Sequence, residues 1–295
     1  MFFDDYPRFR QTSEVAANAA RLNLRHEAIF AANRDILAGA RVLDLACNDG
    51  RWSFAALKAG ARQVVGIEAR PELCENARQS MKHYDIEADS YEFVCGDVLD
   101  HLGENDVEAD VVLCLGYLYH TYRHTELLHH VRRLNPSHLI VDTHVIPGET
   151  RPLLQVKTER PHRQGAAVAD PYSHNDQTLV THPSLSAVVK LVNTYEFGVE
   201  ELYDWPALLA AHPRKPGVGD YAGGRRVTLR CRLGAPNDPN LPPTPPCGGE
   251  AVTEAASDTQ EPAEPDADGS RPRWRDVVNR GLSRAVGYHL TRTRQ

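Results

Sequence analysis

The sequence lacks closely spaced cysteine pairs, long apolar runs and an excess of basic charge. Its six cysteines among 295 residues include no CxxC pair, which excludes the usual zinc-site spacing and argues against a disulfide framework. No stretch approaches the roughly 18 apolar residues of a membrane-spanning helix, and the opening MFFDDYPRFR lacks the layout of a secretory signal. The net charge of −7 disfavours a broad nucleic-acid surface. We therefore expect a soluble, cytoplasmic protein with reduced cysteines and no membrane span.

Short apolar runs alternate with amphipathic stretches between residues 41 and 144, as in βαβ units. The expected strands are Arg41–Leu45, Gln63–Ile67, Tyr91–Cys95, Asp110–Leu115 and His138–His144, and the expected helices are Trp52–Ala59, Pro71–Tyr84 and Thr125–Leu134. A helix at Ser184–Val192 and strands at Tyr195–Tyr203 and Arg225–Leu233 would complete the sheet. The pattern predicts an α/β, Rossmann-like, doubly wound and mostly parallel seven-stranded sheet with an antiparallel edge hairpin.

Composition divides the chain into four segments. Residues 1–40 read as an N-terminal helical cap, and residues 41–234 as the catalytic domain, with a proline-interrupted insertion at 147–181 that is typical of a lid or a substrate-binding loop. Residues 235–270 contain no lysine or arginine and are rich in proline and acidic residues, which indicates a disordered linker. Residues 271–295 form a basic amphipathic helix in this interpretation, docked on the domain or a partner, or acting as a membrane-surface or nucleic-acid arm.

One motif indicates a ligand site. The run from Val42 to Gly50 is a strand with Asp44 near its end, then a tight turn into a helix, and the next strand ends in Glu68. Such a turn presents backbone N–H groups and a helix N-terminus to a ligand in the crevice at the strand ends. Glu68 is placed to accept hydrogen bonds from both hydroxyls of a ribose.

This motif resembles that of the class I S-adenosylmethionine-dependent methyltransferases, an acid followed by three alternating glycines. Ala46 and Asn48 replace the first two glycines and Gly50 remains. The substitutions weaken a dinucleotide interpretation, because Asn48 would crowd a pyrophosphate.

The rest of the family pattern follows in register over residues 41–145. The resemblance implies that Asp97 and Val98 hold the adenine and that Leu115 and Gly116 line the methionine arm of S-adenosylmethionine. The alternative is that the acidic residues merely cap turns between strands and helices. Arg25 in the N-terminal helical region, with Tyr6 before it, is a candidate for binding the methionine carboxylate, although ordinary helix-surface charge explains it equally well.

The catalytic candidates follow the fourth and fifth strands. Asp142 and His144 are two residues apart, so strand alternation places both on one face, towards the crevice. His120, after the fourth strand, is also placed to reach the pocket. A histidine can take the proton of an acceptor hydroxyl. A hydrogen-bonded cluster without a catalytic role is the alternative.

Oxygen ligands for Mg²⁺ are a further expectation. Asp142 could gather with Asp170 and Glu149 of the insertion around this cation, which prefers carboxylates, water and substrate oxygens. The alternative is that the acids of the insertion are solvated loop residues.

The FFDDYPRF opening, the RLNLRHEAI helix and the core motif together resemble the mycobacterial sugar 1-O-methyltransferases of methylmannose polysaccharide biosynthesis. This resemblance implies a metal-assisted transfer to the 1-OH of a short methylated mannoside, in a homodimer. The run from Leu115 to His120 also resembles tRNA wobble-uridine carboxymethyltransferases. Residues 1–234 hold 26 basic and 31 acidic side chains, a balance that does not favour tRNA. A non-catalytic module that binds S-adenosylmethionine is the third interpretation.

Overall fold

A seven-stranded sheet forms the centre of the computed structural model, which describes residues 1–15, 18–213 and 217–237. The strand order is β3-β2-β1-β4-β5-β9-β8. The strands are β1 (Arg41–Leu45), β2 (Gln63–Glu68), β3 (Tyr91–Cys95), β4 (Val111–Leu115), β5 (His138–His144), β8 (Phe197–Leu202) and β9 (Arg226–Leu233). The first five pair in parallel, and β9 runs antiparallel to both β5 and β8. The expected α/β fold with an antiparallel edge hairpin is thus confirmed.

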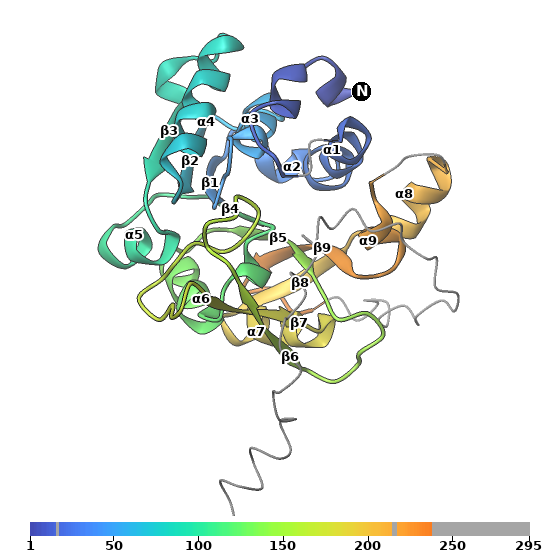
Figure 1. Cartoon of the computed structure of the whole chain (residues 1–295). Helices are drawn as coiled ribbons and strands as arrows, with labels where there is room; N and C mark the ends of the chain where they lie inside the picture. Colours follow the sequence, from blue (N-terminus) through green and yellow to red (C-terminus); the bar gives the residue numbers. More distant parts are fainter. Residues whose placement is uncertain (16–17, 214–216, 238–295) are drawn as a thin grey trace, which may run out of the picture. The chain divides into compact units, whose positions relative to one another are not determined.

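Helices cover both faces of this sheet (Figure 1). They are α1 (Ala19–His26), α2 (Arg34–Leu37), α3 (Arg51–Lys58), α4 (Pro71–His83), α5 (Val98–Glu104), α6 (His124–Arg133), α7 (Leu185–Thr194), α8 (Trp205–Ala211) and α9 (Gly219–Ala222). Single turns of 3₁₀ helix lie at Phe2–Asp4, Pro7–Arg10, Ala88–Ser90 and Leu118–His120, and a π-helical turn at Glu27–Ala31. In Figure 1, α1 to α3 lie to the upper right of β1, and α6 and α7 lie below β4 and β5.

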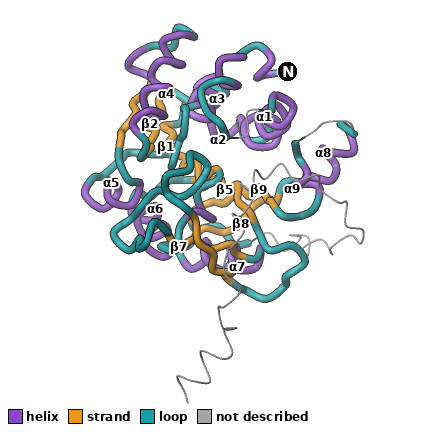
Figure 2. Tube along the Cα trace, in the orientation of Figure 1, coloured by secondary structure: helices purple, strands orange, loops and turns teal. Residues whose placement is uncertain are grey.

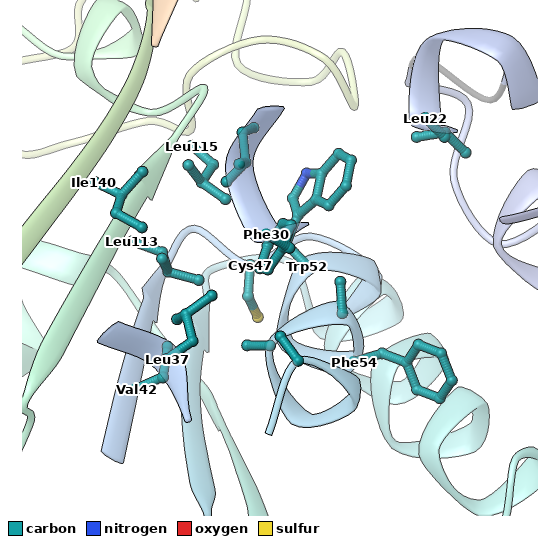
Figure 3. Close-up of a cluster of buried hydrophobic side chains, with 14 of the residues drawn as sticks. Leu22, Phe30, Leu37, Val42, Cys47, Trp52, Phe54, Leu113, Leu115 and Ile140 are labelled. Atoms are coloured by element: carbon teal, nitrogen blue, oxygen red, sulfur yellow. The ribbon is translucent and has the colours of Figure 1, made fainter. Parts of the chain in front are cut away.

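The core follows from alternation along strands that are buried on both faces. In β4, Val111, Leu113 and Leu115 face one apolar cluster, whereas Val112 and Cys114 face the other. The first cluster joins the sheet to α3 and to the N-terminal helices (Figure 3). The N-terminal cap is therefore part of the core of this domain.

The N-terminal region and the insertion differ from expectation. The helical cap expected over residues 1–40 is divided into two 3₁₀ turns, α1, the π-helical turn and α2. The insertion was expected to be a lid or a substrate-binding loop, and no strand was predicted in it. It contains β6 (Leu154–Glu159), which pairs in an antiparallel sheet with β7 (Thr178–Pro183) at its end. The alternation of apolar and polar residues in Leu154-Gln155-Val156-Lys157 is the signal that was missed. Figure 2 shows loop along most of the rest of the insertion.

The predicted linker and terminal helix lie outside the described residues, except for residues 235–237. There Oδ1 of Asn237 accepts a hydrogen bond from the N–H of Val199 in β8 at 3.0 Å. The chain therefore still packs on the sheet beyond the domain boundary expected at residue 234. Within the described ranges, no helix is long and apolar enough to cross a membrane.

Candidate active site

The turn between β1 and α3 has an unusual backbone. Ala46, Asn48 and Gly50 have φ angles of 53°, 54° and 75°, in the left-handed region that disfavours a side chain. Asn48 offsets part of this strain, because its Oδ1 accepts from the N–H of Asp49 at 2.9 Å. At Gly50 a Cβ would lie 2.8 Å from the Cβ of Ala77. The three positions at which the methyltransferase motif has glycine are thus those where the chain turns left-handed.

Asp44 lies buried beneath this turn, with 1% of its surface exposed. Ser53 Oγ, from the first turns of α3, donates to Asp44 Oδ2 at 2.7 Å. Burial raises the pKa of Asp44 to about 7, and the hydrogen bond from Ser53 opposes that rise. Asp44 therefore links the strand to the helix that follows it.

Glu68 ends β2 and faces the same turn. Its Oε2 accepts from the N–H of Asn48 at 3.0 Å, and its Oε1 accepts from the N–H of Arg70 at 2.9 Å. Burial raises the pKa of Glu68, against the effect of these two bonds. The carboxylate is thereby fixed beside the turn, and its expected role in ribose binding stays a prediction.

The remaining residues expected at the cofactor lie after β3 and β4. Oδ1 of Asp97 caps α5 by accepting from the N–H groups of Leu99 and Asp100 at 2.8 and 3.2 Å, so the turn-capping alternative describes one of its two oxygens. Val98 is buried in the core. Leu115 ends β4, and Gly116 follows with a φ of 93°. The adjacent, parallel strands β3, β2, β1 and β4 thus bring all of these residues to one edge of the sheet.

A buried ion pair at the start of α3 was not anticipated from the sequence. Arg51 donates to both carboxylate oxygens of Asp49 at 2.7 and 2.8 Å, and both side chains are almost completely buried. Thr12 Oγ1 also donates to Asp49 at 2.6 Å, and Arg51 donates to the carbonyl of Val15 at 3.0 Å. These bonds tie the N-terminal segment to the start of α3.

Asp142 is the centre of a second buried network. Its Oδ1 accepts from Arg25 at 2.9 Å and from Arg226 at 2.7 Å, and its Oδ2 accepts from Tyr221 at 2.8 Å and Thr228 at 2.7 Å. Burial opposes the charge on Asp142, but the two arginines outweigh it and lower its pKa. This network was not anticipated from the sequence, where its only local signal is Arg226 within the apolar pattern of β9.

The expected metal ligands do not come together. Both oxygens of Asp142 are already engaged by the side chains just described. Glu149 pairs with its neighbour Arg151 at 2.9 Å, and Asp170 accepts from Ser173 Oγ at 2.9 Å within its own turn. No cluster of three histidine, cysteine or acidic side chains suited to a metal occurs in the described part of the chain. The donor set therefore does not fit Mg²⁺.

Arg25 and Tyr6, the cofactor-binding candidates of the N-terminal region, lie in different surroundings. Arg25 reaches the strand ends through Asp142 and stacks over Trp52, with its guanidinium carbon 4.6 Å from the ring centroid. Its Nε is buried without a hydrogen-bond partner among the described residues. Tyr6 instead packs against Phe54 and Tyr84, with ring centroids 4.6 and 5.1 Å away. Tyr84 is the C-cap residue of α4. Tyr6 therefore packs the N-terminal region against the end of this helix and lies away from the C-terminal ends of the strands.

Three histidines and a tyrosine lie next to the Asp142 network. The ring centroid of Tyr119 is 4.2 Å from that of His120, 4.6 Å from that of His144 and 5.6 Å from that of His182. Burial and the Arg226 cation lower the pKa of His144 to about 3. Burial lowers the pKa of His182 to about 4. The structure therefore brings the two predicted catalytic histidines, His120 and His144, against the same tyrosine ring, and His144 is neutral at neutral pH.

The insertion is fastened over this edge of the sheet. Nη2 of Arg70 donates to the backbone carbonyls of Pro161, Arg163 and Ala166 at 3.2, 2.8 and 2.9 Å. Oε1 of Gln164 accepts from the N–H of Glu14 at 2.6 Å. Residues 160–167, here called the strap, thus connect the residue after the Glu68 turn to the N-terminal segment.

Comparison with known proteins gives matches to methyltransferases. Residues 42–136 match the methyltransferase domain family. A tRNA U34 carboxymethyltransferase from Nautilia profundicola is 29% identical over 110 residues, 37% of this chain and 35% of the relative. A ubiquinone biosynthesis O-methyltransferase from Xanthomonas campestris is 34% identical over 105 residues, 36% of this chain and 40% of the relative. The chain thus spans two fifths or less of the length of these relatives.

A solved structure has the same fold. The S-adenosylmethionine-dependent methyltransferase from Mesorhizobium loti superposes with a TM-score of 0.50 and 15% identity, over 72% of this chain and 99% of that protein. Residues 42–136 are thus similar to the methyltransferase domain family, and the chain has the fold of the Mesorhizobium loti S-adenosylmethionine-dependent methyltransferase.

Proposed function

We propose that this protein transfers the methyl group of S-adenosylmethionine to a hydroxyl of a small saccharide. The observation that carries the cofactor assignment is the position of the Glu68 carboxylate, fixed by two backbone N–H groups beside the left-handed turn of β1 and α3. In this proposal Asp97, after the neighbouring strand, accepts a hydrogen bond from the adenine amine. Leu115 and Gly116 line the methionine arm. The buried Nε of Arg25, which has no partner among the described residues, would donate a hydrogen bond to the methionine carboxylate.

The acceptor would lie over the histidines beside this edge. Methyl transfer forms a bond between the acceptor oxygen and the methyl carbon while the bond from that carbon to sulfur breaks, and S-adenosylhomocysteine leaves. Holding the oxygen about 3–3.5 Å from the methyl carbon and in line accounts for much of such catalysis. The hydroxyl proton must also pass to a base, so a histidine next to the oxygen contributes further.

The chemistry of the cluster favours a neutral, polyhydroxylated acceptor. Asp142 is compensated by Arg25 and Arg226, and Asp220 by Arg21 at 2.6 Å, while His144 is uncharged. Neutral imidazoles and the Tyr119 ring supply the hydrogen bonds and the stacking face that a sugar needs. A 1-O-methylated short mannoside product agrees with this chemistry and with the sequence resemblance. Because the donor set does not fit Mg²⁺, the proposed transfer does not use a Mg²⁺ ion.

His144 is suited to holding the acceptor more than to taking its proton. A general base works best when its pKa lies near the working pH, and the pKa of about 3 makes the imidazole of His144 a hydrogen-bond acceptor that holds a proton poorly. Asp142, buried under its arginines, positions Arg226 and has no oxygen left for the substrate.

A tRNA acceptor is the second candidate, favoured by the likeness to the tRNA U34 carboxymethyltransferase. Incubation with labelled S-adenosylmethionine against oligomannosides, uridine-modified tRNA and simple phenols separates the two. We expect label in the oligomannosides and none when Glu68 is replaced by alanine. Label in tRNA would replace the saccharide assignment. Cofactor binding without transfer to any of the three would favour a non-catalytic binding module.

A further inference from the structure

A continuous chain of hydrogen bonds runs from the Glu68 carboxylate to His120 through one peptide group of the strap. The N–H of Arg70 donates to Glu68 Oε1 at 2.9 Å, and Nη2 of Arg70 donates to the carbonyl of Ala166 at 2.9 Å. The N–H of the same peptide unit, that of Ala167, donates to Glu159 Oε2 at 2.6 Å. This oxygen also lies 2.7 Å from Nδ1 of His120. The ribose carboxylate and the histidine are thus joined through the closed strap.

The pair of Glu159 and His120 is partly buried, with 21% and 18% of their side chains exposed. Burial raises the pKa of Glu159, but the hydrogen bonds from His120 and from the N–H of Ala167 outweigh it, so that the pKa lies below its usual range. A carboxylate on Nδ1 selects the tautomer with a proton on that nitrogen. The lone pair is then on Nε2, at the opposite edge of a ring that lies against Tyr119.

We propose that Glu159 is the positioning residue of His120, and that closure of the strap by Arg70 assembles the pair. This inference rests on the proposed function in assigning to His120 Nε2 the proton of the acceptor hydroxyl. The carboxylate holds the ring and stabilises the imidazolium that forms on proton transfer, as in other carboxylate and histidine pairs. Because the bond from Ala167 to Glu159 requires the closed strap, the base is complete only when the crevice is covered.

The position of the ring proton can be measured without knowing the acceptor. The full chain labelled with ¹⁵N-histidine and saturated with S-adenosylhomocysteine is examined by long-range proton–nitrogen NMR at about pH 8.5, where a free imidazole is neutral. His120→Gln assigns the resonance by its loss. We expect the Nδ1–H tautomer in the wild type. Glu159→Gln and Arg70→Gln should each give a mixture of tautomers, while Glu196→Gln, on a glutamate paired with Arg132, should change nothing.

The Nε2–H tautomer in the wild type, or an unchanged tautomer in Glu159→Gln, would overturn the positioning role. An unchanged tautomer in Arg70→Gln alone would overturn the role of strap closure. Circular dichroism and calorimetry with S-adenosylhomocysteine on each variant separate these results from misfolding and from failure of the cofactor assignment.

The second test measures the rate of methyl transfer to whichever acceptor is labelled in the assay with oligomannosides, tRNA and phenols. His120→Gln should lower kcat by about 10²–10⁴-fold, and Glu159→Gln should account for a large part of that loss with little change in the KM for S-adenosylmethionine. If Glu159 acts through His120, its substitution lowers kcat little further in the His120→Gln background. Independent, multiplying losses would contradict the proposal.

Discussion

Asp142 compensates two arginines in the interior of the domain. The exposed fractions of the Asp142, Arg226 and Arg25 side chains are 0%, 4% and 7%. Removing one partner of a buried ion pair leaves an uncompensated charge and typically costs about 3–5 kcal/mol. We therefore expect Asp142→Asn to lower the free energy of unfolding by about this amount in urea denaturation.

The control for this variant is Asp110→Asn. Asp110 pairs with Arg41 at 2.9 Å, but 40% of its side chain is exposed, and such surface pairs contribute only about 0–1 kcal/mol. Equal losses from the two substitutions would show that the Asp142 network is not buried as described.

Ala46 carries backbone strain in the cofactor turn. Its φ of 53° costs a residue with a Cβ about 1–2 kcal/mol, and the greater freedom of glycine in the unfolded chain offsets about 0.4–1 kcal/mol of any gain. Ala46→Gly should therefore raise the free energy of unfolding by up to about 1.6 kcal/mol. Ala56→Gly, inside α3, should lower it by at least about 1 kcal/mol. A loss at Ala46 as large as at Ala56 would be inconsistent with the left-handed turn.

At the scale of elements, local patterns predicted the strands that carry the site. Arg41–Leu45, Tyr91–Cys95 and His138–His144 have the predicted bounds, because each is a short apolar run with punctuation at its ends. The same patterns also placed Asp44, Glu68 and Asp97 at successive strand ends, which the sheet order brings to one edge.

Contacts between distant segments could not be predicted in this way. Arg25 and Arg226 meet on Asp142 only after the N-terminal region and β9 have packed. The sequence therefore did not show that arginines occupy the carboxylate that was predicted to bind a metal. The pairing of His120 with Glu159 likewise depends on β6, a strand whose signal is a few alternating residues. Charge pairing between distant segments therefore altered the roles expected for Asp142 and His120, which were predicted to act on the acceptor, more than those expected for the cofactor-binding residues.

Arg70 holds the strap through its backbone carbonyls, which should protect the strap from proteolysis. The carbonyl of Arg163, which belongs to a bond that trypsin would cut, accepts from Arg70 at 2.8 Å. We expect Arg70→Ala to increase the rate of tryptic cleavage after Arg163, measured by mass spectrometry, and S-adenosylhomocysteine to slow it in the wild type. Arg62→Ala, on an exposed arginine, is the control. Equal cleavage rates in both variants would mean that Arg70 does not fasten the strap.

Across the whole molecule, buried histidines make stability depend on pH. Burial lowers the pKa of His26 and His182 to about 4, and burial with Arg226 lowers that of His144 to about 3. In the unfolded chain a histidine titrates near 6.5, so between these values the unfolded state binds more protons and stability falls as pH falls. The raised pKa of Asp44, about 7, and the raised pKa of Glu68 act in the opposite direction, but they are two groups against three.

The midpoint of thermal unfolding should therefore fall as the pH is lowered from about 7 to about 5. His26 is stacked on Phe2 with ring centroids 3.9 Å apart, so His26→Phe keeps an aromatic ring there and removes one titrating group. We expect a flatter pH dependence in this variant. A slope as steep as that of the wild type would indicate that His26 does not remain neutral in the folded protein.

Calorimetric titration with S-adenosylhomocysteine tests the cofactor site, on which every assignment above depends. The full chain should bind one molecule per chain. Glu68→Ala should lose affinity on the order of 100-fold, because two hydrogen bonds from ribose hydroxyls to a charged group are worth about 3 kcal/mol, while Glu75→Ala on the exposed side of α4 should bind as the wild type does. Absence of binding by the wild type, or equal affinities for the wild type and Glu68→Ala, would contradict the account.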